Sequence, residues 1–465
     1  MSDTTSTIPL IIGGTDIVLP SVDKIWPSSP KDAPHQSFFQ GATPELAIQA
    51  VETAATAFPS WASTPPAKRR ELLLEVARLL RNKSSEARAL IEAEIHCSPL
   101  WSQINFEGAV GIIEETAALL GDSLTGSIPK TQGNSYALVF KEPLGVVLGI
   151  APWNAPLILG VRALVPVVAA GNVAILKGSE LSPRTHYFIA SLFREAGFPP
   201  GVVNFLLHRP QDAGEIYDTI IQRREVRKCN FTGSTQVGRI IASKAALALK
   251  PVLLELGGKN FSLVSADADL DSAAEHIVRA AFLNNGQICM STDLVYVVSS
   301  VADVLIKNIL ERLSAETRAH KVISTASISR LTQLVSDAKS KGAIVHQASN
   351  PLSNNKLGYP ATIIEGLTPD MDFYHIESFG PMFGIVVVES ETEALQMAKS
   401  SGYGLSAALF TRNYFKALEL SREIRAGTIH INSGTVHDEP TLPHGGHGDS
   451  GWGRFGARWG LEEFL

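Results

Sequence analysis

The hydrophobic positions of this chain fall into short continuous runs, separated by segments with helical spacing. Apolar runs of strand length occupy residues 146–151, 173–176, 202–207, 228–231 and 252–256, each bounded by Gly or Pro. Continuous rather than alternating apolar runs are typical of parallel strands that are buried on both faces. Their alternation with helix-length segments predicts a doubly wound α/β sheet.

A second alternation of the same kind follows in the C-terminal half. Strands are expected at residues 261–264, 294–298, 384–388, 407–410 and 428–431, with helices near 270–284 and 301–320. Before the first sheet, apolar residues at helical spacing in residues 44–91 predict two or three helices that cover one face of that sheet. The expected fold class is α/β, with two doubly wound domains.

One apolar stretch is long enough to suggest a membrane span. Between residues 144 and 176 the only charged residue is Arg162. Pro152, Pro156 and Pro166 interrupt the stretch, and an uninterrupted membrane helix does not tolerate that pattern. We expect a strand, a turn, a buried helix and a strand here. The helix after the next strand is expected to begin with Ser182 as N-cap and Pro183 as its first residue.

Composition and charge narrow the classes of function. With 465 residues the chain is longer than one ordinary domain, and 40 basic against 46 acidic residues give a net charge of −6. No basic patch for nucleic acid is visible. Three scattered cysteines and an N-terminus without a secretory signal predict a reducing compartment, so a cytoplasmic location is expected.

The glycine-rich C-terminal segment matches a dinucleotide-binding pattern only superficially. Gly446-x-Gly448-x-x-Gly451 has the spacing of that fingerprint but opens no βαβ unit. His437, Asp438, His444, His447 and Asp449 crowd the same region, yet they lie among glycines with no regular element to fix a ligand geometry. We therefore expect a loop packed at a domain junction and no metal.

A better phosphate site lies where a predicted strand ends and a helix over residues 236–249 begins. The segment reads Phe231-Thr232-Gly233-Ser234-Thr235-Gln236-Val237-Gly238. Free N–H groups at a helix start favour a phosphate. Arg239 and Ile240 stand where a nucleotide-hydrolysing loop needs Lys and Ser or Thr, so that function is disfavoured. The alternative is an ordinary capped helix.

Three side chains have a chemical and a structural interpretation. Cys289 lies in a polar turn segment, which favours a reactive thiol over an inert buried one. Glu255 ends a predicted strand as either a site carboxylate or an ion-pair partner. Asn154 would either cap a helix or donate its amide to an oxyanion. Glu255 and Asn154, like Gly233 and the loop near Lys177, fall at the carboxyl ends of predicted parallel strands, where open α/β sheets bind ligands.

Six motifs together resemble the NAD(P)-dependent aldehyde dehydrogenase superfamily, in its order and along nearly the whole chain. They are Pro152-Trp153-Asn154, Lys177-x-x-Glu180, Phe231-Thr232-Gly233-Ser234-Thr235, Glu255-Leu256-Gly257-Gly258-Lys259, Gly286-Gln287-Ile288-Cys289 and Glu377-Ser378-Phe379-Gly380-Pro381. Further residues, from Ala151 to Pro156 and from Gly160 to Ala163, are similar to the salicylaldehyde, benzaldehyde and vanillin dehydrogenase branch.

The resemblance implies a reaction and its catalytic residues. Cys289 would attack a small-molecule aldehyde as a thiolate, and Asn154 would hold the resulting oxyanion. Glu255 would activate the water that hydrolyses the thioester to a carboxylic acid. Ala155, a small residue in the family's substrate channel, leaves room for an aromatic or hydrophobic aldehyde. Arg162 would either recognise a polar ring substituent or make a structural ion pair.

The resemblance also implies NAD as cofactor. Gly233 and Ser234 would bind the pyrophosphate, and Glu180 the adenine ribose. The full implied set is Trp153, Lys177, Glu180, Gly233, Ser234, Thr235, Gln236, Val237, Gly238, Leu256, Glu377 and Phe379. A carboxylate near the ribose repels a 2′-phosphate, which favours NAD over NADP. The alternative is that Glu180 is a surface residue near a helix cap.

The domain organisation implied by the resemblance has three parts. An NAD-binding domain would comprise residues 1–130 and 144–256, and a catalytic domain residues 257–445. A bridging β element for oligomerisation would comprise residues 131–143 and 446–465, with a strand near 135–141. The sequence ends at Phe464-Leu465, so we expect the last bridging strand of relatives to be missing. A homodimer, usual for relatives, is less secure for that reason.

Two other classes of function stay open. One is an acylating dehydrogenase or esterase that uses the same Cys289, and the other is a non-catalytic structural relative. A water-activating Glu255 argues against the acylating type. The joint presence of Asn154, Glu255 and Cys289 argues against a relative without activity.

Overall fold

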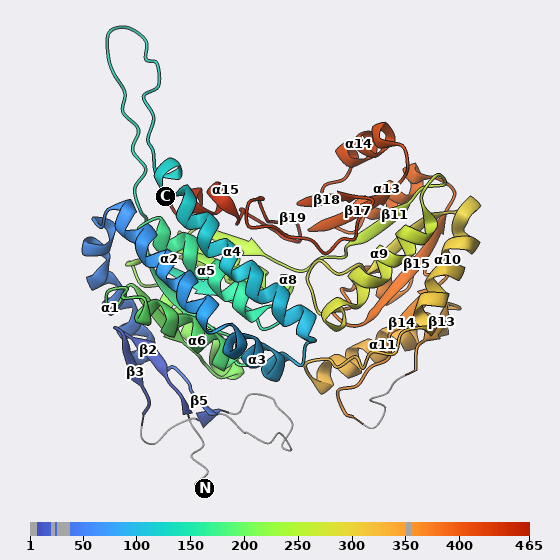
Figure 1. Cartoon of the computed structure of the whole chain (residues 1–465), viewed down its shortest axis with the longest axis horizontal. Helices are drawn as coiled ribbons and strands as arrows, with labels where there is room; N and C mark the ends of the chain where they lie inside the picture. Colours follow the sequence, from blue (N-terminus) through green and yellow to red (C-terminus); the bar gives the residue numbers. More distant parts are fainter. Residues whose placement is uncertain (1–6, 20–23, 26–37, 350–354) are drawn as a thin grey trace.

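Two α/β halves lie side by side in the computed structural model of the chain (Figure 1). The structure describes residues 7–19, 24–25, 38–349 and 355–465. An eight-stranded sheet forms the half coloured mostly blue to green, and a seven-stranded sheet forms the half coloured mostly yellow to red. Strands alternate with helices along the chain in both halves, so the predicted α/β class is confirmed.

Five parallel strands form the centre of the eight-stranded sheet. Their order is β10 (Val252–Glu255), β9 (Val226–Thr232), β6 (Val146–Ile150), β7 (Val173–Lys177) and β8 (Val203–Leu206). All residues of β6 and β8 are buried, as continuous apolar runs require. All five strands predicted from the apolar runs are confirmed.

Short strands extend the edges of this sheet and form a small separate one. Antiparallel β2 (Leu10–Ile12) and β3 (Thr15–Ile17) follow β8, and β20 (Gly451–Trp452) flanks β10 on the other edge. The three-stranded sheet consists of β1 (Thr7–Ile8), β5 (Phe38–Gln40) and β4 (Lys24–Ile25).

Helices cover both faces of the eight-stranded sheet. They are α1 (Pro44–Ala62), α2 (Pro66–Asn82), α3 (Ser84–Ile95), α4 (Pro99–Ser123), α5 (Pro156–Ala169), α6 (Pro183–Glu195), α7 (Ala213–Ile221) and α8 (Thr235–Leu247). Five of them begin at proline, whose fixed φ suits a first turn that needs no N–H acceptor. The predicted helices within residues 44–91 are confirmed, and α4 is an addition.

The prediction that the Ser182 side chain caps α6 is wrong, although the helix does begin at Pro183. Ser182 stands at the N-cap position, but its hydroxyl lies 3.2 Å from His186 Nδ1 and caps no backbone N–H. Glu94, from the end of α3, instead accepts hydrogen bonds from the N–H groups of Arg184 (2.7 Å) and Thr185 (2.9 Å). A carboxylate from a neighbouring helix has two acceptor oxygens for free N–H groups, so it takes the place of the local serine.

The second sheet has seven strands. The strand at one edge, named first in the order below, is antiparallel to its neighbour, and the other six are parallel to one another. The order is β13 (Ile344–Gln347), β14 (Thr362–Glu365), β15 (Met382–Val388), β12 (Leu294–Val298), β11 (Phe261–Val264), β17 (Ser406–Phe410) and β18 (Thr428–Ile431). Its helices are α9 (Leu270–Phe282), α10 (Ser299–Ser314), α11 (Thr325–Ser340), α12 (Asp372–His375), α13 (Glu391–Lys399) and α14 (Tyr414–Glu423). The predicted second alternation is confirmed.

Side chains of this sheet alternate between two separate cores. Leu263 and Tyr296 belong to one buried cluster, whereas Val264, Val295 and Val297 belong to the other. Successive residues of a strand point to opposite faces, so a strand with no polar alternation supplies both cores. The sheet is therefore held on both faces, and the loops at its carboxyl edge rest on a rigid support.

The end of the chain returns to the first half. In Figure 1 the red α15 (Ala457–Glu462) and the C-terminus lie beside the blue α4. On the way, β19 (His447–Gly448) pairs with β16 (Tyr403–Gly404), and β20 pairs with β10. Residues 446–465 thus run across both halves. The domain boundaries expected from the resemblance stay a prediction.

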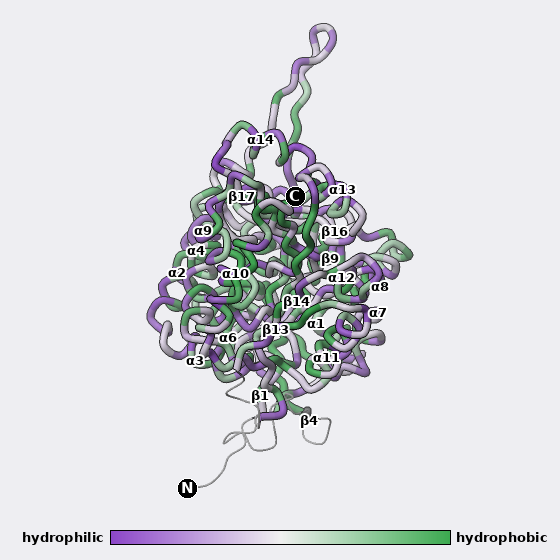
Figure 2. The backbone as a smooth tube through the Cα atoms, turned by 90° about the vertical axis from the view of Figure 1, so that its right-hand side faces the viewer, coloured by the Kyte–Doolittle hydropathy of each residue, from purple (hydrophilic) through white to green (hydrophobic). Residues whose placement is uncertain are grey.

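The segment between α4 and β6 leaves the body of the molecule as a long arm (Figures 1 and 2). We define the arm as residues 124–143. The strand expected near residues 135–141 is not formed: one antiparallel bridge joins Ser127 and Val139, and the rest of the arm has no ladder. Two chain segments with no third strand or covering helix lack the packing that stabilises a sheet.

In the part of the chain that the structure describes, no helix has the length and apolar character needed to cross a membrane. The apolar stretch between residues 144 and 176 folds as β6, a turn, the buried helix α5 and β7. This is the order of elements predicted from its prolines.

Candidate active site

A cavity of about 1140 Å³ lies at the junction of the two halves. Strands β10, β9, β6 and β7 are neighbours in the first sheet, and their carboxyl ends lead into Glu255, Gly233, Asn154 and Lys177 respectively. The predicted common edge is therefore present. Cys289 comes from the second half and lines the same cavity as Asn154 and Glu255.

The chain reaches Cys289 through a left-handed turn. After α9 ends at Phe282, Asn284, Asn285 and Gly286 have φ angles of 47°, 58° and 71°. Asn and Gly are the residues that adopt this region at least cost. A side chain at Gly286 would collide with the backbone of Gly380. The turn thus brings the Cys289 loop against the loop that carries Glu377.

Hydrogen bonds hold Asn154 beside the Cys289 loop. Its backbone carbonyl accepts from Trp101 Nε1 (2.9 Å) and Asn284 Nδ2 (3.1 Å), and its side-chain Nδ2 donates to the Gln287 carbonyl at 3.1 Å. One N–H of the amide is used in this way, and the second is free to face a ligand. The arrangement suits an amide that meets charge developing near the sulfur.

Burial raises the pKa of the Cys289 thiol to about 12, and the charges of Glu255 and Glu377 act in the same direction. Arg162 opposes them and favours the thiolate. Without other groups in the cavity the sulfur is therefore protonated at neutral pH. A nucleophilic role requires that a base or a positive charge be added when ligands bind.

Glu255 lies at one end of a buried chain of charged side chains. His444 Nε2 is 3.0 Å from Glu255 Oε2, and His444 Nδ1 is 3.4 Å from Asp438 Oδ1. Asp438 in turn pairs with Arg162 of α5. Sequence reasoning missed His444 and Asp438 as site residues because it judged them only as metal ligands. Their clustering with other polar residues was the available signal.

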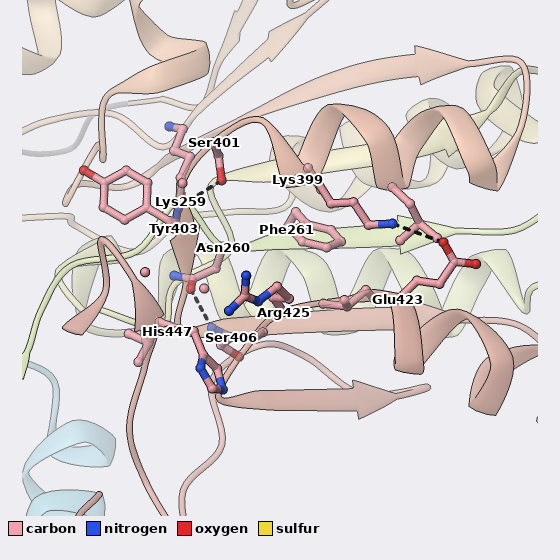
Figure 3. A pocket seen from close by; sticks show the side chains of 18 residues that line it. Lys259, Asn260, Phe261, Lys399, Ser401, Tyr403, Ser406, Glu423, Arg425 and His447 are labelled. Carbon is pink, nitrogen blue, oxygen red and sulfur yellow. Dashed lines mark hydrogen bonds and ion pairs between the residues drawn. The ribbon is translucent and has the colours of Figure 1, made fainter. Parts of the chain in front are cut away.

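Asn260 also holds the loop that carries Cys289. Its Nδ2 donates to the carbonyls of Cys289 (2.7 Å) and Ser291 (3.0 Å), and its Oδ1 accepts from the Ser406 N–H at 3.0 Å. Figure 3 shows Asn260 and this bond to Ser406 at the wall of a second cavity of about 380 Å³. The residue, also absent from the predicted site, holds the backbone at Cys289 through these two carbonyls.

The start of α8 is open toward the large cavity. Ser234 Oγ accepts the Val237 N–H at 3.4 Å, and the remaining first-turn N–H groups have no helical acceptor. Gly233, Ser234, Thr235 and Gln236 line the cavity. A Cβ at Gly233 would lie 2.5 Å from the Phe231 ring, so a larger residue here would have to displace that ring. These features fit the pyrophosphate of a dinucleotide.

Glu377, Phe379 and Trp153 form another part of the cavity wall. Glu377 accepts the Gly258 N–H at 3.1 Å, and the Trp153 and Phe379 rings meet edge to face at 5.7 Å. Burial raises the pKa of Glu377 to about 7, with a further contribution from Asp293. A carboxyl group and two rings that line one wall fit a flat, hydrogen-bonding ring such as nicotinamide.

The predicted cofactor residues do not all lie in the cavity. Leu256 joins its wall, whereas Lys177, Glu180, Val237 and Gly238 are not among its lining residues. Lys177 ends β7, beside β6 on the same sheet edge. Burial lowers the pKa of Lys177, and the charge of Glu180 acts against that shift. The pair thus lies near the cavity but outside it.

The C-terminal glycines support the strand of Glu255. Gly451, with φ of 104°, pairs with Glu255 in the β10–β20 ladder. A Cβ at this position would collide with the Leu254 carbonyl. Ser450 Oγ donates to the Gly257 carbonyl at 2.8 Å. Close backbone approach therefore explains these glycines better than nucleotide binding does. Among the described residues, no group of three or more His, Cys, Asp and Glu side chains is arranged to hold a metal ion.

A thiol, an amide and a carboxyl group on one cavity, between two doubly wound sheets, indicate an α/β enzyme with a cysteine at its centre. The chain belongs to the aldehyde dehydrogenase family, whose model matches residues 21–465. The superfamily resemblance of the six motifs is thereby confirmed.

Relatives with described activities are similar over nearly the whole chain. A vanillin dehydrogenase of Pseudomonas sp. (strain HR199 / DSM 7063) is 40% identical, with 98% of this chain and 96% of the relative covered. The crystal structure of a salicylaldehyde dehydrogenase from Pseudomonas putida G7, complexed with salicylaldehyde, has a TM-score of 0.94 and 34% identity and covers 98% and 96% of the two chains. The expected likeness to that branch is confirmed.

Solved structures in the family also differ in their cofactor. An NADP-dependent glyceraldehyde-3-phosphate dehydrogenase from Bacillus halodurans C-125, complexed with NADP, has a TM-score of 0.92 and 29% identity and covers 99% and 98% of the two chains. Another similar chain, 30% identical and with a TM-score of 0.93, is described as an NAD-dependent aldehyde dehydrogenase from Sinorhizobium meliloti. Family membership therefore implies a nicotinamide cofactor without deciding between NAD and NADP.

Proposed function

We propose that this aldehyde dehydrogenase oxidises an aromatic or hydrophobic aldehyde to its carboxylic acid with NAD, through a thioester on Cys289. The observation that carries the proposal is the convergence of Cys289, Asn154 and Glu255 on one large cavity. The similarity to a vanillin and a salicylaldehyde dehydrogenase supports the substrate class.

In the first step the Cys289 thiol loses its proton to solvent, its sulfur bonds to the aldehyde carbon, and the carbonyl double bond opens to leave an oxyanion. The Asn154 amide and the Cys289 backbone N–H then face the oxyanion, and one such donor lowers the barrier by roughly 3 kcal/mol. The hydrogen bonds from Asn154 to Gln287 and from Asn260 to Cys289 hold these donors in place before substrate arrives. Such preorganisation is what makes the donors effective.

Glu255 acts in the last step, as the base for water. It is buried and aligned by β10, whose pairing on both sides fixes the backbone at Glu255. A carboxylate in this position favours hydrolysis of the thioester over its transfer to a second substrate. This argues for an acid product and against an acylating dehydrogenase.

Residues at the other end of the cavity hold the cofactor. Gly233, Ser234 and the first turn of α8 bind the pyrophosphate, while Glu377, Phe379 and Trp153 enclose the nicotinamide. When bound, the nicotinamide supplies the acceptor for the hydride of the aldehyde carbon. Leu256, which lies against Gly238 of α8, keeps the helix close to β10.

Preference for NAD follows from Glu180. Its carboxylate, close enough to Lys177 to influence its pKa, accepts ribose hydroxyls and repels a 2′-phosphate. The test is the ratio of kcat/KM for NAD to that for NADP. We expect the change Glu180→Gln to reduce this ratio about tenfold, the size of one lost charge interaction. An unchanged ratio would contradict the assignment.

The main test follows NADH formation by the purified protein with benzaldehyde, salicylaldehyde, vanillin and medium-chain aldehydes. Ala155 and the volume of the cavity leave room for an aryl ring, so the aromatic aldehydes are expected to have the higher kcat/KM. Higher kcat/KM for the aliphatic aldehydes would contradict the substrate class. No NADH from any aldehyde, in a protein whose Cys289 is alkylated normally, would contradict the activity.

A homodimer is the assembly that we propose, with the arm as part of its interface. Tyr136 of the arm is 91% exposed and Phe140 is 74% exposed, and Phe415 of α14 is 82% exposed. Apolar side chains in such number on a surface mark an interface. Light scattering on a gel-filtration column is expected to give a dimer, and Tyr136→Glu with Phe140→Glu to give a monomer. A monomeric parent protein would refute this.

The cytoplasmic location stays a prediction.

A further inference from the structure

His444 occupies a position between two carboxylates. Its Nε2 lies 3.0 Å from Glu255 Oε2, and its Nδ1 lies 3.4 Å from Asp438 Oδ1. Both carboxylates and the imidazole are nearly excluded from solvent, with side-chain exposures of 3%, 17% and 5% for Glu255, Asp438 and His444. An imidazole whose two ring nitrogens each lie within ion-pair distance of a carboxylate is held from two sides.

The backbone at His444 is fixed as well. Its N–H donates to the Phe455 carbonyl, and its carbonyl accepts the Phe455 N–H, each at 2.8 Å. Asp438 is held by Arg162, which reaches it from α5 in the first half. The ring therefore approaches Glu255 from a defined direction, and it has little freedom to turn away.

The two oxygens of Glu255 have different surroundings. Oε2 faces His444, whereas Oε1 is buried and has no hydrogen-bond partner among the described residues. An unpartnered buried carboxylate oxygen is costly and calls for a donor. Because Glu255 lines the same cavity as Cys289, a water molecule beside the bound acyl group would supply that donor.

We propose that His444 is a positioning residue for hydrolysis, which holds one oxygen of Glu255 so that the other accepts the proton of the attacking water. This inference rests on the proposed function of Glu255 and adds a partner to it. Arg162, Asp438, His444 and Glu255 form one chain of alternating charge from α5 to the cavity. The order resembles that of a catalytic triad, with a carboxylate at the reacting end.

Water gives one proton to Glu255 Oε1, its oxygen bonds to the acyl carbon, and the bond from that carbon to the Cys289 sulfur breaks. The products are the carboxylic acid, the Cys289 thiolate and protonated Glu255, so the single negative charge moves from Glu255 to sulfur. His444 keeps its own protons and only orients the carboxylate.

The charges around His444 favour the form with two N–H donors. Burial lowers the pKa of His444, but Asp438 and Glu255 together raise it more, to about 9, against an opposing contribution from Arg162. These groups reach the ring from the 432–446 loop, β10 and α5. At neutral pH the ring is thus positively charged between the two carboxylates.

The test separates acylation from hydrolysis. In His444→Leu, acyl transfer to Cys289 is expected to keep its rate, whereas hydrolysis slows roughly 10- to 100-fold, less than the full contribution of a general base because Glu255 itself is retained. Two probes are used: rapid mixing with benzaldehyde and NAD, and 4-nitrophenyl acetate without any cofactor. Each should give a burst of one product per site, followed by a slow phase, with the acyl group found on Cys289 by mass spectrometry.

A second variant and a control complete the experiment. His444→Gln keeps a side-chain N–H donor and is expected to recover hydrolysis to within about fivefold of the parent protein. His447→Leu removes a nearby histidine that lies outside the large cavity, so both phases should stay unchanged. Because the burst itself requires a folded site, it reports on folding in each variant.

The outcomes are distinct. Hydrolysis within about twofold of the parent in His444→Leu, or an equal loss of both phases, would overturn the positioning role. If the parent protein hydrolyses the ester but oxidises no aldehyde, the proposed function fails while the ester arm still decides the role of His444. If aldehydes are oxidised and the variant behaves like the parent, only this inference fails.

Discussion

The two ends of the cavity are built in different ways. At the cofactor end, the strand β9, the turn at Gly233 and the first turn of α8 follow one another along the chain, and Ser234 caps its own helix. At the nucleophile end, residues far apart in sequence meet: Asn154 binds Gln287, and His444 contacts Glu255. The pyrophosphate part of the cofactor end is thus local, whereas the nucleophile end exists only in the complete fold.

This difference predicts which kinetic constant each end controls. Changes at the nucleophile end should lower kcat and leave cofactor binding intact, because the helix start does not depend on them. Changes at the cofactor end should raise KM for NAD and leave chemistry largely intact. Mutations at each end test this separation.

The largest effect is expected from Cys289→Ser. A serine hydroxyl ionises far less readily than a thiol, so NADH formation should fall by at least about 10³-fold. The affinity for NAD, measured by calorimetry, should stay within about twofold because α8 and Gly233 are untouched. A variant that loses NAD affinity as well would show that the two ends are coupled.

Asn154→Ala should have the next largest effect. It removes the proposed oxyanion donor and also the hydrogen bond to the Gln287 carbonyl. We expect kcat to fall about 10²- to 10³-fold with little change in KM for NAD. Steady-state kinetics with benzaldehyde provide the measurement, and NAD titration is the control. A fall in kcat of less than about fivefold would contradict a catalytic role for Asn154.

Much of the cofactor end could be predicted from sequence because its determinants are local. The apolar run of β9, the glycine and the capping serine are adjacent, so pattern and motif indicate the strand, the turn and the helix together. The left-handed turn before Cys289 is also local, since Asn284, Asn285 and Gly286 favour it.

The nucleophile end could be predicted only in part. Its strand ends and its loop were expected, but the contact of His444 with Glu255 spans most of the catalytic half and has no sequence pattern. The same holds for the Glu94 cap of α6, which replaced the local Ser182. Long-range partners depend on how elements pack, and packing overrides local preference at such positions.

The ionisation of Cys289 offers a test that needs no mutation in the parent protein. Burial raises the pKa of its thiol to about 12. The reactive thiolate is then a small fraction at neutral pH, so the rate of iodoacetamide labelling should rise about tenfold per pH unit between pH 7 and 9. Mass spectrometry of labelled peptides gives the rate.

The control is Cys97, whose pKa burial also raises to about 12 but whose side chain lies outside the cavity. It should label far more slowly than Cys289 at every pH. A labelling rate for Cys289 that is already constant below pH 8 would mean that another group stabilises the thiolate before ligands bind. The nucleophile end would then stabilise the thiolate already in the free protein, which its charges do not indicate.

Ser234→Ala should have the smallest effect, and that effect should be limited to the cofactor end. The change removes the acceptor of the Val237 N–H and costs about 1 kcal/mol, as for other lost N-caps. KM for NAD should rise a few-fold because the first turn of α8 is less ordered, while kcat stays within about twofold. Thermal unfolding and steady-state kinetics measure the two effects. Ser234→Thr retains a capping hydroxyl and should behave like the parent. If Ser234→Ala instead lowered kcat tenfold, the helix start would be part of the chemical step, and the division between a local and a long-range end of the cavity would be wrong.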